Sequence, residues 1–361
     1  MRPAAIDAEA LDRYLQQRAT QDAFSGVGLI TQGDAQIFAG AYGLASRAWR
    51  IPNTLDIRFD TASVTKLFTA VATLQLVENG SLSFDTHVAR ALDLTGTAIP
   101  QEVTVHHLLT HTSGIADDAD EESGEEYADL WKTRSNYGVR ETADFLPQFA
   151  YRPPNFAPGA GCRYCNCGYV LLGLLIERVT GQPYRDYVRQ HIFARSGMLA
   201  SDFFSMDIVH EQVAEGADPL RDAQGGIVGW QRNIYSYPPI GSPDGGAHVT
   251  AGDLDQFLRQ LKAGALLSDE FVQQFFTPQV LHDEREAWRR MYGYGIEFAI
   301  DAADHVLFAE KEGINAGTSA VLRHYPDFDI NVVLLSNMQL GVWEPRRFIH
   351  HMLVPESGAL S

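Results

Sequence analysis

The hydrophobic positions of this chain lie in runs of strand-forming residues near its two ends and follow a helix period in its middle. An amphipathic helix is expected over residues 7–19, where Leu11, Tyr14 and Leu15 share one face. Gly33 and Asp34 then predict the turn of an antiparallel hairpin. The predicted strands cover residues 26–31, 35–42, 295–300, 306–309, 318–325 and 330–336.

Helical periodicity dominates the middle of the chain, from about residue 86 to 200. Residues 201–247 show no regular period and contain several Gly and Pro pairs, which indicates irregular structure. The predicted helices after the first cover residues 64–78, 105–111, 168–179, 184–193 and 345–353.

This order of elements predicts an α+β fold. Because the strands lie at both ends, we expect one central antiparallel sheet flanked by helices, an α/β sandwich, with a mostly helical domain inserted. The sheet domain would comprise residues 1–85 together with 247–361, and the helical domain residues 86–246.

Charge narrows the classes of partner. The 361 residues carry a formal net charge of −18, which disfavours nucleic acid and anionic membrane surfaces as partners. The first nine residues are acidic and amphipathic, unlike a signal peptide, so a cytoplasmic location is expected unless a leader has been removed. The sequence does not indicate the oligomeric state.

The cysteines do not form a disulfide framework. All three lie within Cys162-x-x-Cys165-x-Cys167, and a zinc site would need a fourth ligand that the neighbouring sequence does not offer. We therefore expect free thiols that pack in the interior, and neither a metal nor a cofactor. Sensitivity of the activity to cysteine oxidation remains an alternative.

Two other groups of polar residues have simple structural interpretations. Residues 117–126 contain seven carboxylates in ten positions, which predicts a solvated loop, with a lid over a site as the alternative. His107 and His111 are four residues apart on a predicted helix, without a third ligand nearby, and are expected to be structural.

The strongest candidate for chemistry is Ser63-x-x-Lys66 at the start of the helix predicted over residues 64–78. Residues three apart share a helix face, so the Lys66 amine is expected beside the Ser63 hydroxyl. A desolvated lysine can activate a serine as nucleophile. The chain has only 4 lysines against 24 arginines, which suggests that Lys66 is present because lysine, unlike arginine, can lose its proton.

Two further motifs could support this pair. Tyr164 and Asn166 begin the helix predicted over residues 168–179, and a phenol with a lowered pKa can pass protons, while the amide can orient a carbonyl or the lysine. In the triplet Lys311-Glu312-Gly313, the lysine could keep the pKa of the phenol low, and the glycine could let a substrate approach the backbone closely. The N–H of Ile314 could join that of Ser63 around an oxyanion.

Taken in this order, Ser-x-x-Lys, Tyr-x-Asn and a Lys-x-Gly-like triplet resemble class C β-lactamases, DD-peptidases and family VIII esterases. The segment from Leu108 to Gly114 and the segment from Phe156 to Gly159 add to the resemblance, which extends over residues 10–350. It implies a β-lactamase/transpeptidase-like fold with the site in the cleft between the two domains. It also implies an acyl-enzyme on Ser63, with Lys66 and Tyr164 relaying protons and with Asn166 and Lys311 supporting them.

The third motif departs from the family at Glu312, where a hydroxyl residue is usual. A glutamate repels an anionic substrate group, unless it turns out of the cleft or pairs with Arg or Lys. We therefore favour a carboxylesterase-like hydrolase of neutral or cationic esters and amides. The alternatives are a β-lactamase or D-amino-acid peptidase or amidase, and, more remotely, a relative without catalytic activity that serves in binding or assembly.

Overall fold

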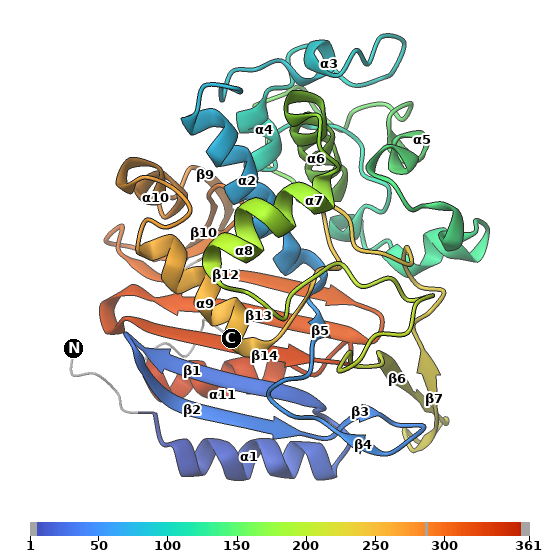
Figure 1. The fold of residues 1–361 in the computed structure, drawn as a ribbon, viewed down its shortest axis with the longest axis vertical. Coiled ribbons are helices and arrows are strands. Elements are labelled where there is room, and N and C mark those ends of the chain that lie inside the picture. The colour runs from blue at the N-terminus through green and yellow to red at the C-terminus, as the bar shows by residue number, and fades with distance from the viewer. Residues whose placement is uncertain (1–5, 286–287, 355–361) are drawn as a thin grey trace.

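A single antiparallel sheet, built from both ends of the chain, forms the centre of the computed structural model, which describes residues 6–285 and 288–354 (Figure 1). Its strands, in spatial order, are β2 (Ala35–Tyr42), β1 (Gly26–Gln32), β14 (Ile330–Ser336), β13 (Thr318–Tyr325), β12 (Val306–Asn315), β11 (Glu297–Asp301), β10 (Trp288–Tyr292) and β9 (Val280–Glu284). This arrangement confirms the α+β fold with a central antiparallel sheet.

The two ends of the chain meet where β1 pairs with β14. Gly26 lies opposite Ser336, and the pairing runs to Gln32 opposite Ile330. A Cβ on Gly26 would come within 1.9 Å of the Leu335 carbonyl oxygen, so this close approach requires glycine. The sheet therefore joins strands from residues 26–42 with strands from residues 280–336.

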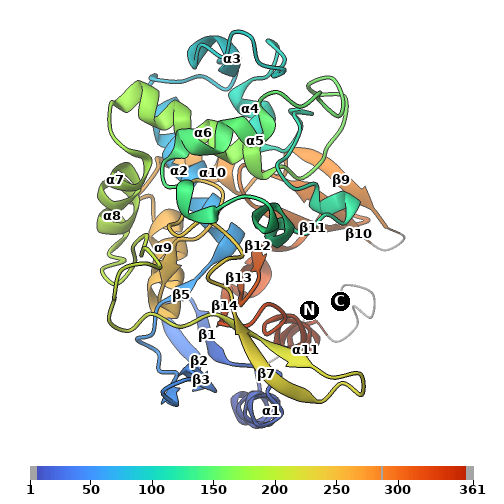
Figure 2. The same ribbon diagram turned by 90° about the vertical axis from the view of Figure 1, so that its right-hand side faces the viewer.

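Helices cover both faces of the sheet. Figure 2 shows α9 (Ala251–Lys262) and α11 (Trp343–Leu353) on opposite sides of it. Helix α1 (Ala8–Thr20) lies beside α11, and the rings of Tyr14 and Phe348 stack with their centroids 4.0 Å apart. On the other face, α9 contacts β1 and β14, and α2 (Lys66–Glu78) continues the layer.

The rest of the helical part lies beyond the α2 and α9 side of the sheet (Figure 1). It contains α3 (Val88–Ala91), α4 (Val105–Leu109), α5 (Leu146–Phe149), α6 (Asn166–Thr180), α7 (Tyr184–Val188), which continues as a π-helix (Arg189–Phe193), and α8 (Ala194–Ser196), while α10 (Asp269–Phe275) follows α9. One cluster of buried apolar residues extends from Val333 in the sheet to Leu172 in α6. The boundaries proposed for the two domains remain a prediction.

Several elements differ from the sequence-based expectation. The segment 201–247, expected to be irregular, contains a hairpin of β6 (Ala217–Arg221) and β7 (Ile227–Arg232). Helix α9, with Leu254, Phe257 and Leu261 buried, was not foreseen, nor were α10, β9 and β10. Short strands also pair locally, β3 (Leu44–Ser46) with β4 (Ile51–Pro52) and β5 (Phe59–Asp60) with β8 (His248–Val249).

Among the helices of the described part of the chain, none combines the length and apolar character needed to cross a bilayer. Residues 1–5, which belong to the N-terminal stretch interpreted above as unlike a signal peptide, lie outside the described residues.

A buried carboxylate fastens α9 to the sheet. Asp255 is 3% exposed, and its Oδ1 accepts hydrogen bonds from Thr31 Oγ1 at 2.7 Å and from Asn331 Nδ2 at 2.9 Å. Arg259 Nε lies 3.1 Å from Oδ2. One side chain therefore joins β1, β14 and α9.

We expect Asp255→Ala to lower the free energy of unfolding by roughly 2–4 kcal/mol, because two buried donors lose their acceptor. Urea denaturation followed by circular dichroism measures this change. The control is Glu9→Ala, which removes an exposed ion pair with Arg13 and should change the free energy by less than about 0.5 kcal/mol. Equal effects of the two substitutions would contradict the anchoring role of Asp255.

Candidate active site

Ser63 lies in a tight turn between β5 and α2. The turn is a 3-10 helix (Ala62–Thr65), and Ala62 adopts a left-handed conformation with φ 43°. Such a φ is unfavourable for a residue with a Cβ, so the surroundings must hold it. Asp60 Oδ1 accepts the Ala62 N–H at 2.7 Å, and the Thr65 hydroxyl donates to the Ala62 carbonyl at 2.7 Å.

A second segment fixes the same turn from the side of β8. Thr61 Oγ1 donates to the Ala247 carbonyl at 2.8 Å, and the Ala247 N–H donates to Thr65 Oγ1 at 3.0 Å. The Gly246 N–H donates to the Ala62 carbonyl at 3.3 Å. Residues 246–247 therefore fix the backbone that carries Ser63.

The structure brings Ser63, Lys66 and Tyr164 together. Lys66 Nζ lies 3.1 Å from Ser63 Oγ, and the Tyr164 hydroxyl lies 2.8 Å from the same oxygen. Lys66 comes from the first turn of α2, whereas Tyr164 precedes α6 by two residues. The serine hydroxyl thus has a potential proton acceptor and a phenol within hydrogen-bond distance.

Lys66 is fully buried, and neutral oxygens surround its amine. Besides Ser63, Nζ donates to Asn166 Oδ1 at 2.7 Å and to the Asp244 carbonyl at 2.6 Å. Burial lowers the pKa of Lys66 to about 8; Asp244 acts in the opposite direction, and Lys311 lowers the pKa further. A substantial fraction of the amine is therefore neutral near physiological pH.

The expectation of an acidic phenol is wrong in direction. Burial raises the pKa of Tyr164 well above its usual value, and the Glu121 carboxylate raises it further. Lys66 Nζ and Lys311 Nζ each lie 4.9 Å from the centroid of the Tyr164 ring. These ammonium groups do not offset the loss of hydration, so Tyr164 is a neutral hydroxyl in the free protein.

Lys311, Gly313 and Ile314 lie on β12 next to the serine turn. Lys311 is 2% exposed and forms an ion pair with Glu297 at 2.9 Å. A Cβ on Gly313 would lie 2.2 Å from the Thr61 carbonyl oxygen and 2.9 Å from Ser63 N, so only glycine permits this contact. The side chain of Ile314 is accessible and lines the hollows on both sides of Ser63.

Beyond Glu310, the backbone of β12 has no paired strand on the side of β11 among the described residues. The pairing of β11 with β12 ends at Glu297 opposite Glu310, whereas residues 311–315 continue to pair with β13. The third motif lies in this stretch of β12, in the interior of the sheet and not on one of its two edge strands. A substrate can approach the strand there.

Glu312 pairs with an arginine, which was one of the two alternatives left open by the sequence. Arg346 Nη1 on α11 lies 2.5 Å from Glu312 and 3.2 Å from Glu310. Burial raises the pKa of Glu312, the neighbouring Glu310 raises it further, and Arg346 opposes both. Its charge is therefore largely compensated by the C-terminal helix.

The acidic segment 117–126 is not simply a solvated loop, and for its first residues that prediction is wrong. Asp117 and Asp118 are 6% and 1% exposed. Residues 111–122 accept the backbone N–H groups of five consecutive residues, 163–167. His111 accepts two of them, from Arg163 at its carbonyl (2.9 Å) and from Cys165 at Nδ1 (3.1 Å), and Glu122 Oε1 accepts that of Tyr164 (2.7 Å). Asp117 accepts the other two, from Asn166 at Oδ2 (2.8 Å) and from Cys167 at Oδ1 (2.9 Å). Residues 111–122 therefore fix the backbone that leads into α6.

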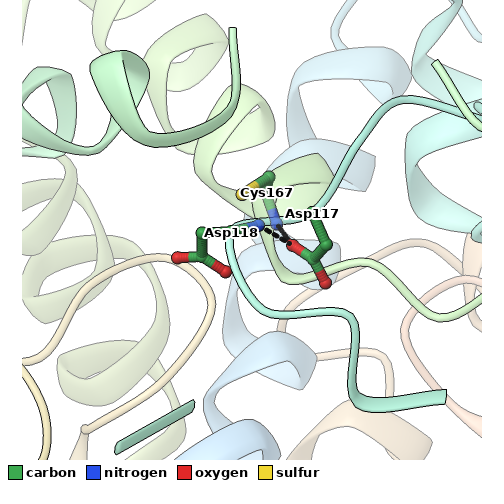
Figure 3. A group of neighbouring side chains, drawn as sticks. All are labelled: Asp117, Asp118 and Cys167. Carbon is green, nitrogen blue, oxygen red and sulfur yellow. Dashed lines mark hydrogen bonds between the residues drawn. The ribbon is translucent and has the colours of Figure 1, made fainter. Parts of the chain in front are cut away.

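Asp117, Asp118 and Cys167 gather below the start of α6 (Figure 3). Oxygen and sulfur atoms at such spacing can hold a metal ion, but three of the four carboxylate oxygens already accept backbone N–H groups. Asp117 Oδ1 accepts from Cys167 N and Asp118 N, and Asp118 Oδ1 accepts from Ala119 N. Burial also raises the pKa of the Cys167 thiol well above its usual value. The group fits a cap for α6 better than a cation site.

The three cysteines are free thiols. Cys165 and Cys167 are buried, as expected, whereas Cys162 is partly exposed. Burial raises the pKa of Cys162 to about 12, and the neighbouring Glu122 adds to this. All three are protonated at neutral pH, so none is an activated nucleophile.

Sequence reasoning missed Glu121 and Asp244 as residues of the site. Glu121 Oε1 accepts from Asn166 Nδ2 at 3.0 Å, which leaves the amide oxygen of Asn166 facing Lys66. Asp244 supplies the backbone carbonyl for Lys66. The lid alternative for residues 117–126 pointed to Glu121, but nothing in the sequence indicated a backbone carbonyl.

Two hollows flank Ser63. One has an apolar wall formed by Phe204, Met206, Tyr237, Pro238, Pro239 and Ile240, together with the carboxylates Asp60, Glu121 and Asp244. The other is lined mainly by charged side chains, namely Glu121, Glu122, Glu297, Glu312, Arg290 and Lys311. A substrate whose carbonyl reaches Ser63 therefore has an apolar surface on one side and a charged surface on the other.

The chain is similar to known proteins over most of its length. The Beta-lactamase family model matches residues 11–348. Esterase EstB from Burkholderia gladioli is 32% identical over 286 residues, which cover 72% of this chain and 69% of EstB. Penicillin-binding protein 4* from Bacillus subtilis (strain 168) is 30% identical over 332 residues, which cover 88% of this chain and 68% of that protein.

Among solved structures, a penicillin-binding protein from Bacillus halodurans is 38% identical and superimposes with a TM-score of 0.85, over 93% of this chain and 99% of that one. The fold is therefore shared over almost the whole chain. Because the family model also matches nearly its full length, the chain belongs to the β-lactamase family of serine hydrolases.

Proposed function

We propose that this protein hydrolyses esters through an acyl-enzyme on Ser63. The observation that carries the proposal is the position of Ser63 Oγ, 3.1 Å from the amine of a buried lysine and 2.8 Å from the Tyr164 hydroxyl. A serine so placed has a base and a proton donor at once. The likeness to esterase EstB supports an ester as the substrate.

In the proposed reaction, Ser63 Oγ attacks the carbonyl carbon and gives its proton to neutral Lys66. The N–H groups of Ser63 and Ile314 stabilise the negative charge on the carbonyl oxygen. Lys66 returns the proton through the Tyr164 hydroxyl to the leaving alkoxide, which departs as the alcohol. Water then attacks the acyl-enzyme, its proton follows the reverse route to Ser63, and the acid is released.

The charge of the cleft favours neutral or cationic substrates. Six carboxylates line the two hollows beside Ser63, whereas Arg290 and Lys311 are the Lys and Arg side chains among the lining residues. The formal net charge of −18 acts in the same direction at longer range. Since Glu312 is paired with Arg346, this preference rests mainly on the other carboxylates, Glu121 among them.

A D-amino-acid peptidase, amidase or β-lactamase activity is the second candidate, favoured by the likeness to penicillin-binding proteins. It also proceeds through an acyl group on Ser63, but the bond that breaks is an amide bond, so the leaving group is an amine and not an alcohol. Turnover of p-nitrophenyl acetate, nitrocefin and a D-alanyl amide under one set of conditions separates the candidates. Nitrocefin hydrolysis far faster than ester hydrolysis would favour the second.

A fluorophosphonate probe tests the nucleophile. We expect mass spectrometry to find the probe on Ser63 and no adduct in Ser63→Ala, because the substitution removes the attacking oxygen. Ser113→Ala, which removes a buried hydroxyl outside the described relay, is the control and should label as the parent does. A folded protein that remains unlabelled would support a relative without catalytic activity.

The pH profile tests Lys66 as the base. Since the pKa of Lys66 is lowered to about 8, the neutral amine is lost as the pH falls below this value. We expect kcat/KM for p-nitrophenyl acetate to fall about tenfold per pH unit below roughly pH 7. Lys66→Arg, which cannot deprotonate, should lower kcat by roughly 10³-fold or more.

Lys262→Arg provides the matched control, because Lys262 forms an ion pair with Asp329 on the protein surface. This variant should keep both the rate and the pH profile. A kcat/KM that does not change between pH 6 and pH 8 would contradict the role of Lys66.

The substrate preference is tested with isosteric esters of different charge. Acetylcholine should have a kcat/KM about tenfold higher than 3,3-dimethylbutyl acetate at low salt, and the ratio should shrink as salt screens the cleft. Glu121→Gln, which keeps a hydrogen-bond acceptor for Asn166, should reduce the ratio, while Glu9→Gln on the exposed face of α1 should not. Equal kcat/KM values for the two esters would refute the preference for cations.

A further inference from the structure

His111 occupies an unusual place for a histidine that the proposed reaction does not use. It was expected on a helix, but α4 ends at Leu109, and His111 adopts a left-handed φ of 58°. The residue is 3% exposed. A non-glycine residue rarely adopts this conformation, and the surrounding structure must hold it there.

His111 accepts two hydrogen bonds, from the residues on either side of Tyr164. The His111 carbonyl accepts the N–H of Arg163 at 2.9 Å, and Nδ1 of its ring accepts the N–H of Cys165 at 3.1 Å. The residues immediately before and after the tyrosine are thus fastened to one residue. In this conformation the carbonyl and the ring of His111 both face residues 163–165.

The ring of His111 also touches the phenol. Its centroid lies 4.6 Å from that of Tyr164, 5.2 Å from that of Tyr169 and 4.8 Å from that of Tyr292. The ring must be neutral to accept the Cys165 N–H at Nδ1. Burial lowers the pKa of His111 well below its usual value, and Lys311 and Lys66 lower it further, so the acceptor persists at neutral pH.

We propose that His111 is a positioning residue for Tyr164: it fixes the backbone on both sides of the phenol and packs against its ring, and so holds the hydroxyl at 2.8 Å from Ser63. This inference rests on the proposed proton relay through Tyr164. A phenol displaced by about 1 Å can no longer carry protons between Lys66 and the leaving group, and such a shift costs up to about 10²-fold in rate.

A pair of variants that both tolerate the left-handed φ tests the inference. In His111→Asn, Oδ1 is bonded to Cγ as Nδ1 is in histidine, so it can accept the Cys165 N–H. His111→Gly allows the same φ but has no side-chain acceptor for the Cys165 N–H. Asparagine should keep kcat for p-nitrophenyl acetate within about fivefold of the parent, whereas glycine should lower it by about 50-fold or more with little change in KM.

The readouts separate positioning from mere stability. Melting temperatures are measured for both variants, and His111→Phe keeps the ring volume without the acceptor should the glycine variant fail to fold. Rescue by asparagine but not by glycine or phenylalanine supports the inference. An equal loss of kcat in the asparagine and phenylalanine variants, or no loss in any, would overturn it.

The proposed function is checked separately in the parent protein. If the parent shows neither Ser63 labelling nor ester turnover, the proposed function has failed. If the parent is active but kcat does not depend on the acceptor at position 111, only the positioning role has failed.

Discussion

The burial of the Lys66 amine is the constraint on which the rest of the site depends. A lysine removed from water must find hydrogen-bond partners, and here three neutral oxygens provide them: Ser63 Oγ, Asn166 Oδ1 and the Asp244 carbonyl. These oxygens come from the serine turn, the start of α6 and the segment before β8. Neutral partners solvate the amine without stabilising its charge as a carboxylate would, which is consistent with a pKa near 8.

The approach to α6 follows from the same requirement. Asn166 can face Lys66 only if the backbone before the helix is held in place, and residues 111–122 hold it by accepting five consecutive N–H groups. Carboxylates suit this task because the first N–H groups of a helix have no acceptor within it. The carboxylates of this segment therefore hold the backbone of the site in place, and only some of them face solvent.

The sheet forms the third side of the cleft. Helix α11, which packs on the opposite face of the sheet, supplies an arginine that pairs with a glutamate of the cleft. Glu312 on β12 is compensated by Arg346 from α11, a helix at the end of the chain. Lys311 is compensated by Glu297 from β11. The two charged residues of the third motif are thus neutralised by neighbours, and Gly313 remains as the point where strand and serine turn touch.

Local physical chemistry in the sequence determined a large part of this protein. Runs of strand-forming residues predicted β1, β2, β13 and β14, and the helical spacing of apolar residues predicted α1, α2 and α6, because both signals are local in the sequence. The spacing of Ser63 and Lys66 predicted their contact, since one helical turn joins them. The order of the motifs indicated the family.

Only the tertiary structure decided the rest. The state of Tyr164 depends on how far packing removes water, which is why its pKa is raised although two ammonium groups lie near its ring. Glu312 pairs with Arg346, and Asp117 accepts the N–H groups of Asn166 and Cys167. The partners in each contact lie more than 30 residues apart in the sequence, so no local pattern encodes them. Burial and long-range partners arise from the assembled chain, so the charge of a side chain and its neighbours in the cleft could not be derived from sequence spacing.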